Sequence, residues 1–101
     1  MSEPITMLCI YTPQEGAEEK FFALLENHYS TLAGTGLVTD KPAKLWRATD
    51  KNGRVHFIER FQWKETGSSD IAHQTPEVMS IWEPMGAIAD NMQFLQIEPV
   101  E

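Results

Sequence analysis

The sequence has few features that could stabilise or anchor a fold by any means other than packing. Cys9 is the single cysteine among 101 residues, so an internal disulfide is excluded, and no Cys/His cluster has zinc-finger spacing. No apolar run approaches the roughly 20 residues that span a bilayer. The N-terminus, Met-Ser-Glu-Pro, is acidic where a signal peptide is basic. We therefore expect a cytoplasmic protein, with Cys9 as an inert buried thiol.

Basic residues are also scarce. Eight Lys and Arg stand against fifteen Asp and Glu, which gives a net charge of −7 at pH 7. That sign is wrong for a protein that tracks a phosphate backbone or an anionic membrane, so we expect neither as a partner. The sequence also lacks a Gly-rich phosphate loop, a Gly-x-Ser-x-Gly motif, a His-Glu-x-x-His motif and a dinucleotide fingerprint. It therefore predicts no dedicated cofactor and no metal site.

What the sequence does contain is enough apolar material for one packed domain, expected to span residues 1–101. A hydrophobic fraction of 42%, with ten aromatic residues, excludes an intrinsically disordered chain. Runs of β-branched and apolar residues predict strands at 5–12, 44–49, 54–64 and 92–97. Apolar residues at the 3.6-residue spacing predict helices over 15–33 and from 76 onward, with a short helical turn near 67–70. Pro84 predicts a kink or an early break in the second helix.

This order, β-α-β-β-α-β, predicts an α+β fold of the ferredoxin-like type, with two helices on one face of an antiparallel sheet. Three of the strands are apolar on both faces, through Met7 and Leu8, Phe57 and Ile58, and Phe94 and Leu95. Because one chain has no further element to cover the second face, we expect a homodimer that stacks sheet against sheet. A scatter of exposed apolar residues, as on any protein, is the alternative that stays open.

Two segments are similar to a known family. They are Glu59-Arg60-Phe61-Gln62-Trp63 and Ile71-Ala72-His73-Gln74-Thr75-Pro76, which set Trp63 and His73 ten residues apart. With them, the chain resembles the dimeric α/β-barrel proteins of the antibiotic biosynthesis monooxygenase (ABM) superfamily. The resemblance implies a pocket that His73 faces. It also implies a range of activities, because members include cofactor-free oxygenases of quinol-like aromatics, haem-degrading oxygenases, small isomerases and proteins of no known activity. The first strand lacks the asparagine typical of haem-degrading relatives, which argues against haem degradation and leaves haem binding through His73 open.

The candidate catalytic residues are His73 and Glu59. An imidazole at the start of the second helix can take a proton from a phenol, and Glu59 can orient or charge it. Glu59 interrupts an apolar strand face, where burial raises the pKa of a carboxyl unless a cation meets it. A Gly-bulged turn over 50–53, favoured because Asp50 suits its first position, places Leu45 opposite Glu59 and predicts Arg47 as its ion-pair partner. A two-residue Asn-Gly turn would place Trp46 opposite Glu59 instead. The candidate substrate-binding residues are His28, Trp82, Phe57 and Trp63. Each of these side chains also has a purely structural interpretation, as a satisfied polar group or as core.

Two functions follow from these residues. The first is a homodimeric, ABM-like protein whose small apolar pocket works as a cofactor-independent monooxygenase of an aromatic or quinol-like small molecule. His73 would deprotonate that molecule, and the resulting anion would itself reduce oxygen. The alternative is a non-catalytic dimer that binds a small molecule or has a structural role. From the sequence, whether the chain is an enzyme at all stays open.

Overall fold

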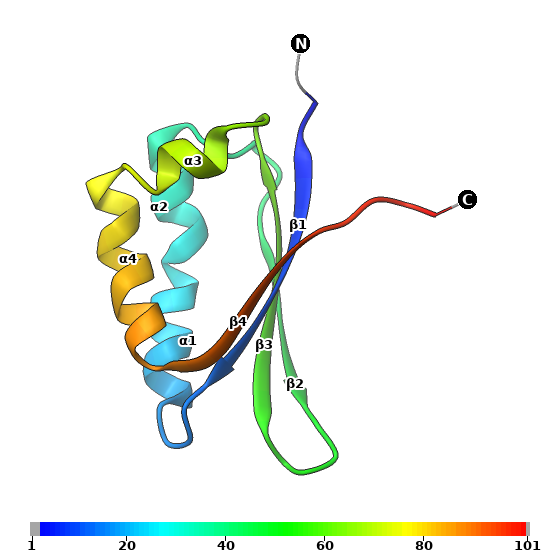
Figure 1. Cartoon of the computed structure of the whole chain (residues 1–101), viewed down its shortest axis with the longest axis vertical. Coiled ribbons are helices and arrows are strands. Elements are labelled where there is room, and N and C mark those ends of the chain that lie inside the picture. The colour runs from blue at the N-terminus through cyan, green and yellow to red at the C-terminus, as the bar shows by residue number, and fades with distance from the viewer. Residues whose placement is uncertain (1–2, 101) are drawn as a thin grey trace.

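The computed structural model, which describes residues 3–100, contains one antiparallel sheet with helices on one side of it (Figure 1). The four strands are β1 (Ile5–Pro13), β2 (Lys44–Thr49), β3 (Val55–Trp63) and β4 (Ala89–Gln96), in the spatial order β2-β3-β1-β4. The helices are α1 (Glu18–Glu26), α2 (His28–Thr35), α3 (Ser68–Ala72) and α4 (Pro76–Ala87). With α1 and α2 as one helical arm and α3 and α4 as the other, the order is β-α-β-β-α-β. The predicted α+β, ferredoxin-like architecture is therefore confirmed.

The core lies between the helices and the sheet, because strand side chains alternate between the two faces. Along β3, the residues Phe57, Glu59, Phe61 and Trp63 are buried, and those between them are only half-buried. From the helices, Phe21, Leu25, Leu32, Val78 and Met85 pack against this face. Glu59, with none of its surface exposed, is the one carboxylate among the buried residues of the described chain.

The first helical arm is not the single helix that the apolar spacing predicts. It is divided at Asn27, which ends α1 and precedes α2. The Asn27 side chain donates to the carbonyl of Ala23, and the hydroxyls of Ser30 and Thr31 both donate to the carbonyl of Asn27. Such side-chain bonds compete with the backbone ladder of a helix, which explains the interruption. As predicted, glycine ends the arm, since Gly36 has a left-handed φ of 76°.

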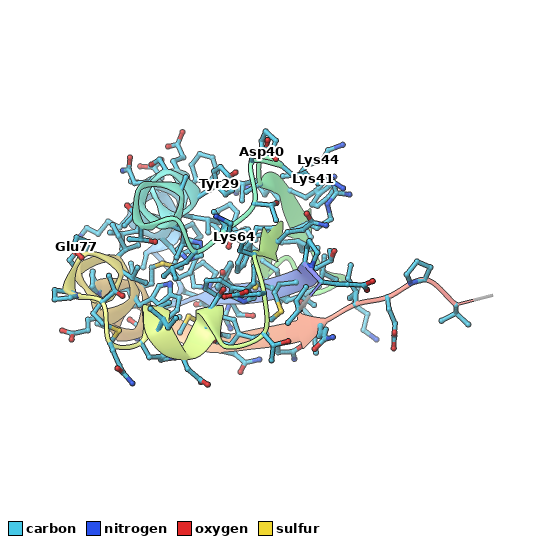
Figure 2. All side chains as sticks on the ribbon, turned by 90° about the horizontal axis from the view of Figure 1, so that it is seen from above. Tyr29, Asp40, Lys41, Lys44, Lys64 and Glu77 are labelled. Atoms are coloured by element: carbon cyan, nitrogen blue, oxygen red, sulfur yellow. The ribbon has the colours of Figure 1, made fainter. Side chains whose placement is uncertain are left out.

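Tyr29 helps to hold the second part of this arm against the rest of the molecule. Its hydroxyl donates to the carbonyl of Thr39 at 2.8 Å. In Figure 2, Tyr29 lies between α2 and the segment at Asp40, which leads into β2. The adjacent residue in the chain is His28, so this bond fixes the part of α2 from which the His28 side chain projects.

The early break predicted at Pro84 is wrong. Helix α4 passes through Pro84 and ends at Ala87. Proline has no N–H, so the Ser80 carbonyl receives no helical bond from it. The buried side chains of Val78 and Met85, one on each side of this gap, keep the helix packed on the sheet.

The hairpin between β2 and β3 has the predicted bulged turn. The Gly53 amide donates to the Asp50 carbonyl at 2.9 Å, and Gly53 has a φ of 82°. As predicted, Leu45 is opposite Glu59. The predicted ion pair between Arg47 and Glu59 is wrong, however. Arg47 is opposite Phe57 and places its guanidinium 6.0 Å from that ring, whereas Glu59 finds closer partners on the helix side.

The sheet face away from the helices carries an apolar patch, defined here as Trp46, Ile58, Ile10, Leu8 and Leu95, with the cations of Lys44 and Arg60 over the Trp46 ring. In the register, Trp46 is opposite Ile58, Ile58 is opposite Ile10, and Leu8 is opposite Leu95. Trp46 is 40% exposed and Leu95 is 43% exposed. No helix within residues 3–100 covers this face (Figure 1).

None of the helices in the described range 3–100 has the length and apolar character needed to cross a membrane.

Candidate active site

Four buried or half-buried side chains from four different elements form a chain of hydrogen bonds around Glu59. The Tyr11 hydroxyl of β1 donates to Glu59 Oε1 at 2.7 Å. His28 Nδ1 of α2 lies 2.9 Å from both carboxylate oxygens. On the other side of the imidazole, Trp82 Nε1 of α4 donates to His28 Nε2 at 2.7 Å. Trp82, His28, Glu59 and Tyr11 are therefore linked without a break.

The bond from Trp82 fixes the protonation of His28. An indole N–H can only donate, so His28 Nε2 must accept and carries no proton. The single proton of the neutral imidazole is then on Nδ1, from which it is donated to Glu59. As long as the Trp82 bond is intact, His28 stays neutral and the Glu59 carboxylate has two neutral donors.

The neighbours of Glu59 on β1 are held in their protonated forms. Burial, and then the charge of Glu59, raise the pKa of Tyr11 well above its usual value, so Tyr11 remains a donor. Burial, followed by the charge of the directly opposite Glu59, raises the pKa of Cys9 to about 12. The Cys9 side chain is therefore a thiol at neutral pH, in agreement with the inert, buried cysteine that the sequence predicts.

An apolar cavity of about 160 Å³ adjoins this chain of bonds. Its lining residues are Met7, Tyr11, His28, Phe61, Trp63, Ser69, His73, Trp82 and Phe94. A second hollow, of about 210 Å³, shares Tyr11, His73, Trp82 and Phe94 with the first. A dry cavity of roughly 150 Å³ holds a benzene molecule. The first cavity is thus of the size of one aromatic ring, and the second adds room for substituents.

His73 lies at the exposed side of the cavity with one ring nitrogen free. Its Nδ1 is 2.8 Å from the Ser69 carbonyl, which can only accept, so the proton of the neutral ring is on Nδ1. His73 Nε2 therefore carries a lone pair, and no bond to it is present within residues 3–100. The ring centroids of His73 and Trp82 are 4.7 Å apart. Trp82 is thus in contact with both histidines, since its ring centroid is 6.1 Å from that of His28.

Most of the predicted site residues meet at this cavity. His28, Trp63, His73 and Trp82 all line it, and the Trp63 and Trp82 rings are 6.4 Å apart. Phe57 does not line it. Phe57 is buried in the core, where it stacks on Phe21 with ring centroids 6.1 Å apart.

Glu59 also lies outside the lining, behind Tyr11 and His28. The carboxylate that the sequence analysis expects to orient His73 is bonded to His28 instead. Tyr11 is a site residue that was not predicted from the sequence. The feature that could have indicated Tyr11 is its position two residues after Cys9 on β1, where it lies opposite Phe57 and on the same sheet face as Glu59. That signal can be used only once the pairing of β1 with β3 is known.

The residues present do not fit a haem group. His73 Nε2 has the chemistry of an iron ligand. However, a cavity that holds a single six-membered ring is too small for a porphyrin of four pyrrole rings. No group of three or more His, Cys, Asp or Glu side chains within residues 3–100 could hold a metal ion.

Fold and site together define a class, the ferredoxin-like α+β proteins with an apolar cavity between helices and sheet. Solved structures that share this fold include a cofactor-independent oxygenase and a putative monooxygenase. SnoaB from Streptomyces nogalater, a cofactor-independent oxygenase, is 14% identical, with a TM-score of 0.76 over 99% of this chain and 96% of that chain. A putative antibiotic biosynthesis monooxygenase from Bacteroides thetaiotaomicron is 13% identical, with a TM-score of 0.72 over 98% and 91% of the two chains.

A third similar structure, PA3566 from Pseudomonas aeruginosa, is 16% identical, with a TM-score of 0.72 over 100% of this chain and 98% of that chain. At such identities the likeness is one of fold alone, and it agrees with the ferredoxin-like α+β fold predicted from the order of the elements. No protein-family model and no curated protein matches the chain.

Proposed function

We propose that this chain is a homodimeric, cofactor-independent monooxygenase of a one-ring phenol or quinol-like molecule. The observation that carries the proposal is His73, whose Nε2 lone pair is free beside Trp82 at the edge of an apolar, ring-sized cavity. The fold shared with SnoaB, a cofactor-independent oxygenase, supports it. The cytoplasmic location predicted from the sequence belongs to the same proposal.

In this proposal the protein supplies a base and a dry cavity. His73 Nε2 takes the hydroxyl proton of the substrate, while the Ser69 carbonyl holds the Nδ1–H and so fixes the orientation of the ring. The phenolate is electron-rich and reduces molecular oxygen directly. One oxygen atom enters the ring as a carbonyl and the other leaves as water, so that phenol plus oxygen gives quinone plus water. The four electrons come from the ring itself.

A thermal-shift panel tests the binding part of the proposal. One-ring phenols and quinols are compared with haem, flavins, hydroxynaphthoquinones and fatty acids. A ligand at 100 times its Kd stabilises the fold by about 2.7 kcal/mol, and each kcal/mol shifts Tm by roughly 4–8 °C in a domain of this size.

We expect one-ring ligands to stabilise the wild type and to lose this effect in His73→Ala. They should keep it in His56→Ala, since His56 bonds to Asp50 and Thr12, away from the cavity. If none of the phenols and quinols raises Tm, the proposal is contradicted.

The homodimer rests on the apolar patch of the sheet. Trp46 and Leu95 are substantially exposed on it, and no described helix covers it. An exposed apolar patch bordered by charged side chains, here Lys44 and Arg60, is typical of an interface. A second copy, stacked sheet against sheet by a two-fold axis, would cover the same patch on both chains.

One observation favours the alternative, a non-catalytic dimer that binds a small molecule or has a structural role. Trp82, His28, Glu59 and Tyr11 satisfy one another's hydrogen bonds, so these polar groups are accounted for without a ligand. The two functions differ in oxygen consumption, which only the monooxygenase requires.

A further inference from the structure

We infer that His28, backed by Glu59, is a second proton acceptor of the cavity, and that the Trp82 N–H stabilises the oxygen that has lost its proton. This inference rests on the proposed function for the class of substrate. It starts from the fact that Trp82 N–H and His28 Nε2, a donor and an acceptor, are bonded to each other at the cavity wall.

A hydroxyl group can satisfy both of these partners at once. Inserted between them, its O–H donates to His28 Nε2 and its oxygen accepts from Trp82 Nε1. The step that follows is a proton transfer only. The O–H bond breaks, an N–H bond forms at Nε2, and no electrons change hands. The bond from Trp82, which keeps His28 neutral in the free protein, becomes a bond to the new oxyanion.

Glu59 makes His28 a better acceptor than its burial alone would allow. A protonated imidazole is costly in an apolar site unless an anion meets it. His28 Nδ1–H already faces the Glu59 carboxylate at 2.9 Å, so the imidazolium forms inside a ready ion pair. His73 lacks such a partner, because a neutral carbonyl occupies its Nδ1. The two histidines therefore differ. His28 is buried and its protonated ring would pair with the Glu59 carboxylate, whereas His73 is accessible and has no such partner.

Opening the Trp82–His28 bond requires the indole to move, and the surroundings of Trp82 leave room for this. The indole borders both hollows, so it can turn away from His28 toward the space of about 210 Å³ lined also by Met79 and Met92. The turn of α4 that carries Trp82 also lacks one backbone bond, because Pro84 cannot donate to Ser80.

Two proton acceptors in one cavity identify the substrate more closely. A ring with one hydroxyl uses one of them, whereas a ring with two hydroxyls can donate to His73 and to His28. Of the phenols and quinols named in the proposed function, a ring with two hydroxyls therefore uses this cavity more fully than a simple phenol.

The first test is a nitrogen NMR measurement of the histidine rings. We expect His28 in the free protein at pH 7 to be neutral, with its proton on Nδ1. Addition of 4-nitrocatechol, an electron-poor diol that resists oxidation, should shift the signals of His28 Nε2 and Trp82 Nε1–H together. If the diol moves only the His73 signals, or none, the inference is wrong.

The second test compares the Kd of 4-nitrocatechol with that of 4-nitrophenol, which lacks the second hydroxyl. In the wild type we expect the diol to bind about tenfold more tightly, as for one hydrogen bond to a charged group. Glu59→Gln and Trp82→Phe should each remove this ratio, whereas Trp63→Phe, which also deletes an indole from the lining, should keep it. A purely structural role for Glu59 would weaken both probes alike and leave the ratio unchanged, which would overturn the inference.

Failure of the inference and failure of the proposed function give different results. If the diol ratio depends on Glu59 but no quinol consumes oxygen, the inference stands and the monooxygenase is wrong. If quinols incorporate one atom of labelled oxygen in a reaction that needs His73 but not Glu59 or Trp82, the monooxygenase stands and the inference is wrong.

Discussion

Glu59 is the residue that orders the polar groups of the site. A carboxylate with no exposed surface is tolerated only when it is hydrogen-bonded, and here Tyr11 and His28 supply the donors. Its charge then adds to the effect of burial on nearby residues, which include Cys9, directly opposite on β1. Burial and this charge together keep the Tyr11 hydroxyl and the Cys9 thiol protonated, because both raise the pKa of these groups.

The raised pKa of Cys9 makes the stability of the fold depend on pH in a measurable way. Burial and Glu59 raise the pKa of the folded thiol from 9.0 to about 12, so the folded state keeps a proton that the unfolded chain releases. This contribution to stability is present below pH 9 and declines as the pH rises toward 12. We expect the urea midpoint to fall over that interval, and to fall less in Cys9→Ala, in which only the Tyr11 contribution remains. Equal slopes for the two proteins would contradict the shift.

The helices and strands show which parts of the fold are determined by residues close together in the sequence. The strands, the bulged hairpin and the glycine that ends α2 were all predictable, because periodicity and turn residues act over a few positions. The interruption at Asn27 and the passage of α4 through Pro84 were not. In both cases side-chain bonds or core packing outweigh the local preference of the residue.

The same limit explains how the site could be only partly foreseen. His28, His73, Trp63 and Trp82 were identified from helical spacing and from a family resemblance, and all four line the cavity. The partner of Glu59 depends on how α2 sits over β3, which no local pattern encodes. The register of the hairpin alone therefore predicts Arg47 as the partner of Glu59, whereas the actual partner is His28, on a distant element.

Two glycine substitutions test the hairpin and the helix separately. Gly53 has a φ of 82°, so Gly53→Ala is strained and should lower the free energy of unfolding by about 1–2 kcal/mol. Gly34 lies within α2 with open space around its Cβ position, so Gly34→Ala should raise that free energy by about 0.5–1 kcal/mol. Urea unfolding measures both. A destabilising effect of Gly34→Ala similar to that of Gly53→Ala would argue against the backbone described here.

At the scale of the whole molecule, the helices cover one face of the sheet and leave the apolar patch on the other (Figure 1). We expect light scattering at micromolar concentration to give twice the chain mass of 11.5 kDa. Leu95→Lys places a charge on the patch and should shift the protein toward the monomer. Ile71→Lys, at an exposed position on α3, is the matched control and should remain dimeric. A wild-type monomer would show that the patch is not a dimer interface.

The most direct test of the account is oxygen uptake with those one-ring quinols that stabilise the protein in the thermal-shift panel. We expect protein-dependent oxygen consumption without added metal, flavin or haem, and a hydroxyquinone product that contains one atom of labelled oxygen, the other atom leaving as water. His73→Ala should lower the rate by about 100-fold, in the range of a lost general base. A quinol that binds in the cavity but consumes no oxygen beyond the protein-free rate would contradict the central claim and favour the non-catalytic dimer.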